Sequence, residues 1–149
     1  MITVKDILKS KSSSEVYSIG PKATVFEALT VLGTKMIGAL MVKDDDGKVV
    51  GIITERDYAR KIILKGRVSR DTAVEEIMTP RNELYTVTPE TTADDCMVII
   101  TGKKIRHLPV FDGDTFVGLI SIGDLVRSKV MEQERLIEQL SDYIAGRYV

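Results

Sequence analysis

The sequence repeats itself at a spacing of about 68 residues, and this repeat limits the possible folds more than any other feature. Shifting the chain by that distance aligns residues of the same type, among them Tyr17 with Tyr85, Pro21 with Pro89, Thr24 with Thr92, Ile37 with Ile105 and Leu40 with Leu108. After a slip of one residue in a loop, Gly51 and Asp57 align with Gly118 and Asp124. The stretches before the two copies, VKDILK and VEEIMT, are similar as well. The chain therefore contains two copies of one unit.

Each copy has the pattern of a strand, a helix, two further strands and a second helix. Apolar and polar residues alternate over 16–19 and 84–87, which predicts a strand with one buried face. A threonine with an acid three residues later, as in Thr24 and Glu27 or Thr92 and Asp95, is typical of a helix start. The apolar segments 39–42 and 49–53, and again 107–110 and 116–120, are joined by turns rich in Asp and Gly. These pairs predict antiparallel hairpins.

One copy, of about 47 residues, is too small to cover its own sheet. We therefore expect an α+β fold in which two pseudo-symmetric β-α-β-β-α copies pack sheet to sheet. Residues 1–149 would form a single module, with one repeat over 8–66 and the other over 77–130. The last helix is expected to continue over 124–146, because apolar residues recur there in steps of four and three. This stripe either packs back on the module or pairs with another chain; it consists of Val126, Val130, Gln133, Ile137, Leu140 and Ile144.

Composition excludes several classes of protein. The net charge is -1 and no basic stripe is present, which argues against nucleic acid as a partner. No apolar run approaches 18 residues, and charges occupy the N-terminal stretch at Lys5, Asp6 and Lys9, so we expect no membrane segment or signal peptide and a cytoplasmic location. The single cysteine, Cys96, cannot form an internal disulfide or a zinc site. We expect no metal, since the Asp run 44–46 is typical of a solvated turn.

A motif returns at the end of each hairpin: Gly51-Ile-Ile-Thr-Glu-Arg-Asp57 and Gly118-Leu-Ile-Ser-Ile-Gly-Asp124. A hydroxyl residue with Asp three positions later can be a capping box that satisfies free amides at a helix start. The same atoms can also cradle a nucleotide, because helix amides attract phosphate and a carboxylate accepts both hydroxyls of a ribose diol. Capping does not explain the glycine, which in a strand often marks the close approach of a ligand or another backbone.

The two motifs, with EIMTP before the second copy and IRHLPV at its middle strand, resemble a tandem pair of CBS (cystathionine-β-synthase) domains, often called a Bateman module. The family pattern is Gly, hydrophobic, x, Thr or Ser, x, x, Asp, and both copies carry it. The resemblance covers roughly residues 1 to 130. It implies β-α-β-β-α copies with two clefts between them that bind adenosine ligands such as AMP, ADP, ATP or NAD, with AMP the first candidate.

The same resemblance implies positions for the ligand. Thr54 and Asp57 would hold ribose and phosphate in one cleft, as Ser121 and Asp124 would in the other. Adenine would lie against the middle strands, near Ile37, Gly38, Ala39 and Met41 or near Ile105, His107 and Pro109. Arg106 and His107 match the place where basic residues of related proteins meet phosphates, whereas the first copy has Gly38 and Ala39 there. The site of the second copy is therefore expected to bind first, and Arg56 is the best phosphate candidate in the other.

Two functions of different class remain open. The first is a regulatory sensor that binds an adenosine nucleotide and signals to a separate, unknown effector protein. The second is a structural homodimerisation module whose motifs survive as helix caps. CBS pairs commonly associate into disc-like dimers, so the resemblance implies a homodimer for either function. A nucleotide-processing enzyme is a weaker third alternative. His107 is the only histidine and no triad or Gly-rich phosphate loop accompanies it, so we expect no enzyme activity.

Overall fold

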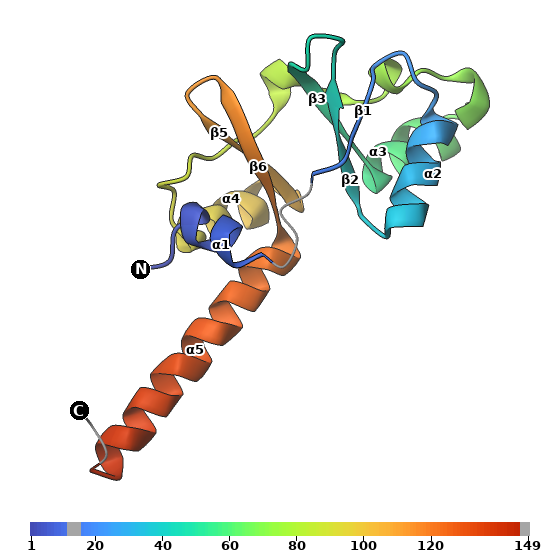
Figure 1. Cartoon of the computed structure of the whole chain (residues 1–149). Helices are drawn as coiled ribbons and strands as arrows, with labels where there is room; N and C mark the ends of the chain where they lie inside the picture. The colour runs from blue at the N-terminus through green and yellow to red at the C-terminus, as the bar shows by residue number, and fades with distance from the viewer. Residues whose placement is uncertain (12–15, 147–149) are drawn as a thin grey trace. The chain divides into compact units, whose positions relative to one another are not determined.

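The computed structural model describes residues 1–11 and 16–146, and it divides into two compact units. The first-repeat unit falls within Glu15–Tyr85, and the second-repeat unit falls within Met1–Ser14 and Thr86–Val149 (Figure 1). Each unit combines helices with a small sheet, which confirms the predicted α+β class. None of the helices among the described residues is long and apolar enough to cross a membrane.

The first-repeat unit contains one sheet of four strands in the order β1-β2-β3-β4. The central pair, β2 (Ala39–Lys43) and β3 (Val49–Thr54), is antiparallel as predicted, while β1 (Ser18–Ile19) lies parallel to β2. The edge strand β4 (Thr79–Pro80) pairs with β3. The helical segments are α2 (Val25–Lys35), α3 (Glu55–Tyr58) continuing into the π-helix η1 (Ala59–Ile63), and the 3₁₀ turns η2 (Ser69–Asp71), η3 (Val74–Glu76) and η4 (Arg81–Glu83).

The second-repeat unit is built around the antiparallel hairpin of β5 (His107–Asp112) and β6 (Thr115–Ser121). Its helices are α1 (Val4–Ser10), α4 (Ala93–Lys103) and α5 (Ile122–Ile144). The strand predicted over 84–87 is reduced to one parallel bridge between Val87 and Val110. The turn η4 precedes this residue, and the amide of Thr88 donates to the Thr91 hydroxyl at 3.0 Å, so the neighbouring residues leave the ladder.

The stretches that precede the two copies, here called the preface segments (3–11 and 72–80), exchange places. The first packs on the helix α4 of the second copy, where the Val4 amide donates to Thr91 O at 2.8 Å and the Ala93 amide donates to Ile2 O at 2.9 Å. The second packs on α2 of the first copy through the matching bonds from Val74 to Ala23 and from Val25 to Thr72, both 2.8 Å. The compact units therefore differ from the sequence repeats, because each unit contains the preface segment of the other copy.

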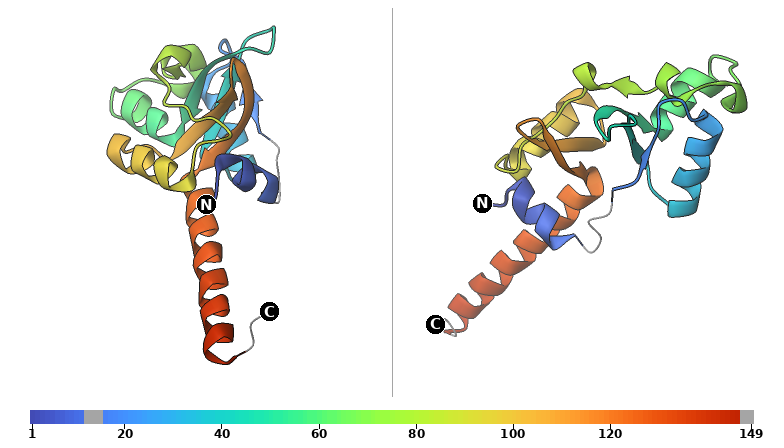
Figure 2. Two further views of the ribbon diagram at one scale, coloured as in Figure 1. Left: turned by 90° about the vertical axis from the view of Figure 1, so that its left-hand side faces the viewer. Right: turned by 45° about the horizontal axis from the view of Figure 1, so that its top comes forward.

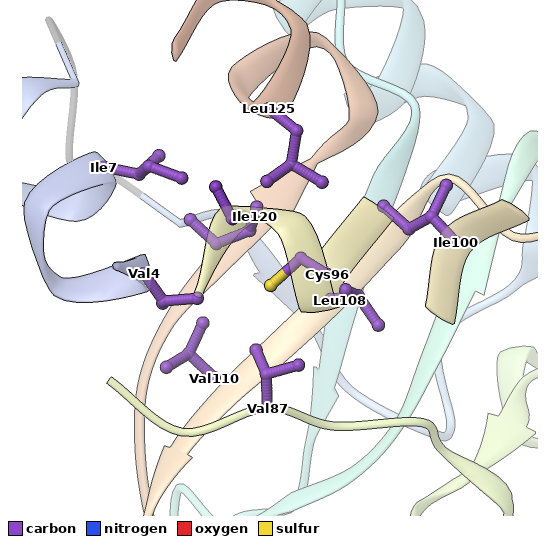
Figure 3. Packing of buried hydrophobic residues seen from close by; sticks show 10 residues of the cluster. Val4, Ile7, Val87, Cys96, Ile100, Leu108, Val110, Ile120 and Leu125 are labelled. Atoms are coloured by element: carbon purple, nitrogen blue, oxygen red, sulfur yellow. The ribbon is translucent and has the colours of Figure 1, made fainter. Parts of the chain in front are cut away.

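Both units have a core drawn from the predicted apolar faces. In the second-repeat unit, preface residues Val4 and Ile7 meet the stripe of α4 and both strands of the hairpin (Figure 3). Cys96 is fully buried in this core, and burial raises the pKa of its thiol to about 11. The core of the first-repeat unit has the equivalent members; it comprises Val25, Ala28, Leu32, Leu40, Val42, Ile53, Ile62, Val74 and Ile77.

The close packing of the preface segments explains the glycine of each motif. A Cβ atom on Gly51 would lie 2.6 Å from the carbonyl oxygen of Thr79 and 2.8 Å from Met78 Sδ. A Cβ atom on Gly118 would lie 2.8 Å from Leu8 Cδ2. Leu8 and Met78 occupy the same position in the two preface segments. The glycines therefore make room for the protein's own chain.

We predict that Gly51→Ala destabilises the protein by about 1–3 kcal/mol, because the new methyl meets a backbone carbonyl that cannot move without breaking the β3–β4 pairing. Gly118→Ala should cost less, since the Leu8 side chain can rotate away. Gly33→Ala is the matched control: it lies in α2 with nothing within 4 Å and should stabilise by about 0.5–1 kcal/mol. Urea unfolding of the three variants measures the order, and an equal effect of Gly51→Ala and Gly118→Ala would contradict this packing account.

Candidate functional site

The motif of the second copy sits where strand β6 ends and helix α5 begins. Ser121 is the N-cap of α5: its hydroxyl oxygen accepts from the Asp124 amide at 3.2 Å, and the Ser121 amide donates to Asp124 Oδ2 at 2.9 Å. This reciprocal pair is the predicted capping box. It turns the aspartate carboxylate back toward the end of the hairpin.

Asp124 is only 7% exposed and is held by two cations. Lys11 Nζ lies 3.0 Å from Asp124 Oδ2 and also donates to the Leu119 carbonyl at 3.0 Å, while Arg127 Nη1 lies 3.4 Å from Oδ1. Burial alone would raise the pKa of this carboxyl, but the Ser121 amide and Lys11 outweigh it and hold the pKa below 3.8. Asp124 is therefore ionised and oriented at neutral pH.

Arg106 and His107 lie beside this junction. His107 begins β5 directly opposite Ser121, and the carbonyl of the exposed Arg106 accepts from the Ile122 amide at 2.9 Å. Burial of the His107 imidazole lowers its pKa, the charge of Asp124 opposes this, and the charges of Arg106 and Lys11 lower it further. Pro109 is buried further along the strand, opposite Leu119. The structure thus places four predicted site residues, Arg106, His107, Ser121 and Asp124, around one end of the hairpin.

The first-repeat unit holds the equivalent arrangement with different cations. Thr54 caps α3, its amide donates to Asp57 Oδ2 at 3.0 Å, and Lys61 Nζ lies 3.2 Å from Asp57 Oδ1. Lys61 also donates to the Ile77 carbonyl at 2.8 Å, which ties the motif to the preface segment. Asp57 is 8% exposed, close to the value for Asp124.

The predicted adenine-side residues of the first copy lie next to this motif. Ala39 is paired with Thr54, and the Gly38 carbonyl accepts from the Glu55 amide at 3.2 Å, as the Arg106 carbonyl does in the other unit. Ile37 packs against the edge of the core. Arg56 is half-buried in α3, one residue before Asp57. The backbone geometry of the two sites is therefore alike, while the side chains at Gly38 and Ala39 carry no charge where Arg106 and His107 stand.

Sequence reasoning missed Lys11. Lys11 lies 113 residues before Asp124 in the chain, and no local pattern joins them. The signal available was indirect: Thr3 and Asp6 form a capping box of the same type as the others, which would have predicted α1 and placed Lys11 at its end. Lys61, one of several basic residues near Thr54, was visible but not singled out.

The arrangement can bind a diol and an anion. A carboxylate can accept about four hydrogen bonds. The Asp124 oxygens accept three, from the Ser121 amide, Lys11 and Arg127. The contact to the exposed Arg127 is the longest of the three. Basic side chains at Lys11, Arg106 and Arg127 surround the same end of the hairpin and would attract phosphate. Over residues 1–11 and 16–146, no three His, Cys, Asp or Glu side chains are grouped to hold a metal ion.

The fold and the duplicated motif define a protein built from two α+β repeats of one type, and comparison with known proteins gives the family. The model of the CBS domain matches residues 4–64 and 74–130. The chain belongs to the CBS-domain family, with two domains in tandem, as the sequence predicts.

Relatives of the whole chain support this assignment. The chain is 42% identical over 151 residues to the CBS domain-containing protein CBSX3, mitochondrial, of Arabidopsis thaliana, covering 98% of this chain and 73% of that protein. A CBS-domain protein from Burkholderia ambifaria MC40-6 matches with a TM-score of 0.82 and 47% identity, over 88% of this chain and 96% of that one. The CBS domain pair of protein MJ0100, solved with 5-methylthioadenosine and S-adenosyl-L-methionine, matches with a TM-score of 0.75 and 28% identity, over 89% and 98% of the chains.

We predict that Lys11→Met lowers the free energy of unfolding by about 1–2 kcal/mol, because it leaves the buried Asp124 carboxylate with less compensation. Lys5→Met is the matched control, since Lys5 is exposed on α1, the helix that Lys11 follows, and its side chain makes no such pair. Chemical denaturation of the two variants measures the difference. Equal stability of both variants would show that the Lys11 contact contributes nothing.

We predict that His107 titrates below pH 6.5, because burial disfavours its charged form. Since the unfolded chain then takes up the proton first, the stability contributed by neutral His107 is fully present above pH 6.5. It is lost as the pH falls through the lower folded pKa. An NMR titration of the single histidine reads the pKa directly, and a His107→Gln variant should lack this part of the pH dependence. A midpoint at or above 6.5 would contradict the prediction.

Proposed function

We propose that the protein is a regulatory module that binds an adenosine ligand, with AMP the first candidate and ADP, ATP or NAD the alternatives, at its two capped motifs. The observation that carries the proposal is Asp124, a buried and ionised carboxylate at a helix start, ringed by basic side chains. An aspartate needed only as a helix cap works equally well on an exposed surface, as Asp6 does in α1. The adenosine compounds bound by the related MJ0100 pair support the ligand class.

In this proposal Asp124 accepts the two ribose hydroxyls, and the phosphate lies toward Arg106, His107 and the amides at the start of α5. Arg127, which is 66% exposed and holds Asp124 by the longest contact, is the cation that gives way most easily to the diol. Pro109 of β5 and Ile105, two residues before that strand, would face the adenine. No step of this binding requires a metal or a catalytic residue, and we propose that the module binds its ligand without changing it.

The site in the first-repeat unit is the weaker of the two in this proposal. Thr54 and Asp57 would take the ribose as their counterparts do, with Ile37, Gly38 and Ala39 along the base. Arg56 would be its phosphate contact, since no basic side chain stands at Gly38 or Ala39. We therefore propose ordered occupancy, with the second-repeat site filling first.

The output is proposed to pass to a separate effector protein, with the chain acting as a homodimer. The cytoplasmic location remains a prediction from the charged N-terminal stretch; the relative from Arabidopsis is described as mitochondrial.

Calorimetric titration of nucleotide-free protein with AMP tests the proposal. We expect saturable heat, with binding weakened about 10- to 100-fold in Asp124→Ala, the loss expected for hydrogen bonds to a charged group. Asp57→Ala should affect only the weaker site. Asp45→Ala, in the exposed hairpin turn, is the control that should bind like the parent. Circular dichroism confirms that each variant is folded.

Ligand analogues separate the contacts. 2′,3′-Dideoxy-AMP lacks the diol and should bind as weakly to the parent as AMP binds to Asp124→Ala, because both remove the same pair of hydrogen bonds. GMP tests the base. If none of AMP, ADP, ATP and NAD gives heat, the motifs are helix caps alone and the structural dimerisation module is the better account.

A further inference from the structure

Helix α5 is far longer than its own unit requires. It runs from Ile122 to Ile144, about 34 Å at 1.5 Å per residue, yet Asp124 and Leu125 are its only buried residues. Beyond its first turns, no other element of the second-repeat unit lies alongside it (Figures 1 and 2). The predicted long C-terminal helix is confirmed, with the bounds Ile122–Ile144 where the sequence predicted 124–146, and Gly146 follows it with a φ of 74°. Packing against the hairpin uses only the first turns of α5 and does not explain the rest of its length.

The exposed part of α5 carries an apolar stripe with heptad spacing. Its five aliphatic members are between 47% and 84% exposed; they are Val126, Val130, Ile137, Leu140 and Ile144. Gln133 occupies the sixth position of the same stripe. Leu136 and Tyr143 widen one border. Such a stripe, sustained for about three heptads, has the geometry of pairing with a helix of equal length.

Charged side chains keep away from this stripe. Glu132, Arg135, Glu138 and Asp142 fall on the other faces of the helix at 100° per residue. Three charged residues border the seam: Arg127, which pairs with Asp124, Lys129, which pairs with Asp94, and Glu134. Two copies of α5 can therefore face each other without opposing like charges. The stripe is self-complementary, which is what a two-fold interface requires.

We propose that α5 pairs with α5 of a second copy of this chain as a parallel, in-register coiled coil. This assigns an interaction surface to the proposed homodimer, and it does not depend on ligand binding. In the parallel arrangement Gln133 meets Gln133 of the partner subunit, where each amide can both donate and accept. Lys129 then borders Glu134 of the partner subunit, the usual attractive pairing across a coiled-coil seam.

The antiparallel arrangement is less favourable. An antiparallel pair that covers the whole stripe would set Gln133 against the aliphatic Ile137 of the other chain, which leaves the amide without a partner. It would also bring the two Glu134 carboxylates together. Gln133 and Glu134 therefore both favour the parallel orientation, and both act through direct contacts at the seam.

Sedimentation velocity of the full chain without ligand tests the proposal. We expect twice the 16.5 kDa of one chain for the parent. Ile137→Glu should sediment at 16.5 kDa, because it places a charge in the seam. Met131→Glu is the matched control, since Met131 is 58% exposed on the same helix outside the stripe, and it should remain dimeric. The milder Ile137→Gln should raise the dimer dissociation constant at least about tenfold.

Leu140→Cys tests the register. The two thiols face each other across a parallel seam and should form a disulfide on mild oxidation, whereas in the antiparallel pair they are far apart. The native Cys96 does not interfere because it is fully buried. A monomeric parent overturns the dimer as a whole, a dimer that survives both Ile137 substitutions overturns the assigned surface, and a dimeric Leu140→Cys without the disulfide overturns the register. Failure of AMP to bind would leave all three results unaffected.

Discussion

The capping box at the junction of hairpin and helix is the interaction on which the rest of the structure depends. In each unit it fixes where the second strand of the hairpin ends and where the helix begins, and it holds an aspartate with under a tenth of its surface exposed. A buried carboxylate needs compensating charge. Lys11 and Lys61 supply it, and each lysine also bonds a backbone carbonyl, so the junction is tied to a preface segment in both units. The junction is thus both a structural joint and an electrostatic site.

The exchange of preface segments gives these junctions a second role. The lysine that compensates Asp124 comes from the end of α1, from which the chain continues into the first-repeat unit. The lysine that compensates Asp57 bonds the preface segment that leads toward the second copy. A ligand that competes for either carboxylate would therefore act on a segment that leads into the other copy. The two ion pairs and the connectivity of the chain therefore give a physical route by which ligand binding would alter the module.

Local patterns predicted those elements whose causes are local. The helix starts at Thr24, Thr92, Thr54 and Ser121 and the two hairpins are confirmed, because capping and turn chemistry act over a few residues. The strand over 84–87 shrinks to a bridge because side-chain and turn bonds of its neighbours compete for the backbone. The exchange of preface segments and the Lys11 contact join distant parts of the chain, which no periodicity reveals. The glycine of each motif marks a close approach; at Gly51 it is the expected approach of another backbone, at Thr79 O, whereas at Gly118 it is the side chain of Leu8.

The central claim, that the capped aspartates form adenosine sites, is tested most directly by mapping AMP binding with backbone amide NMR shifts. The account predicts saturable shifts of the Ser121 and Asp124 amides and of residues 106–107 at the lowest AMP concentrations. The amides of Thr54 and Asp57 should follow at higher concentrations. Shifts absent from both motifs, or confined to surfaces away from them, would contradict the account and leave the capping boxes as joints of the fold alone.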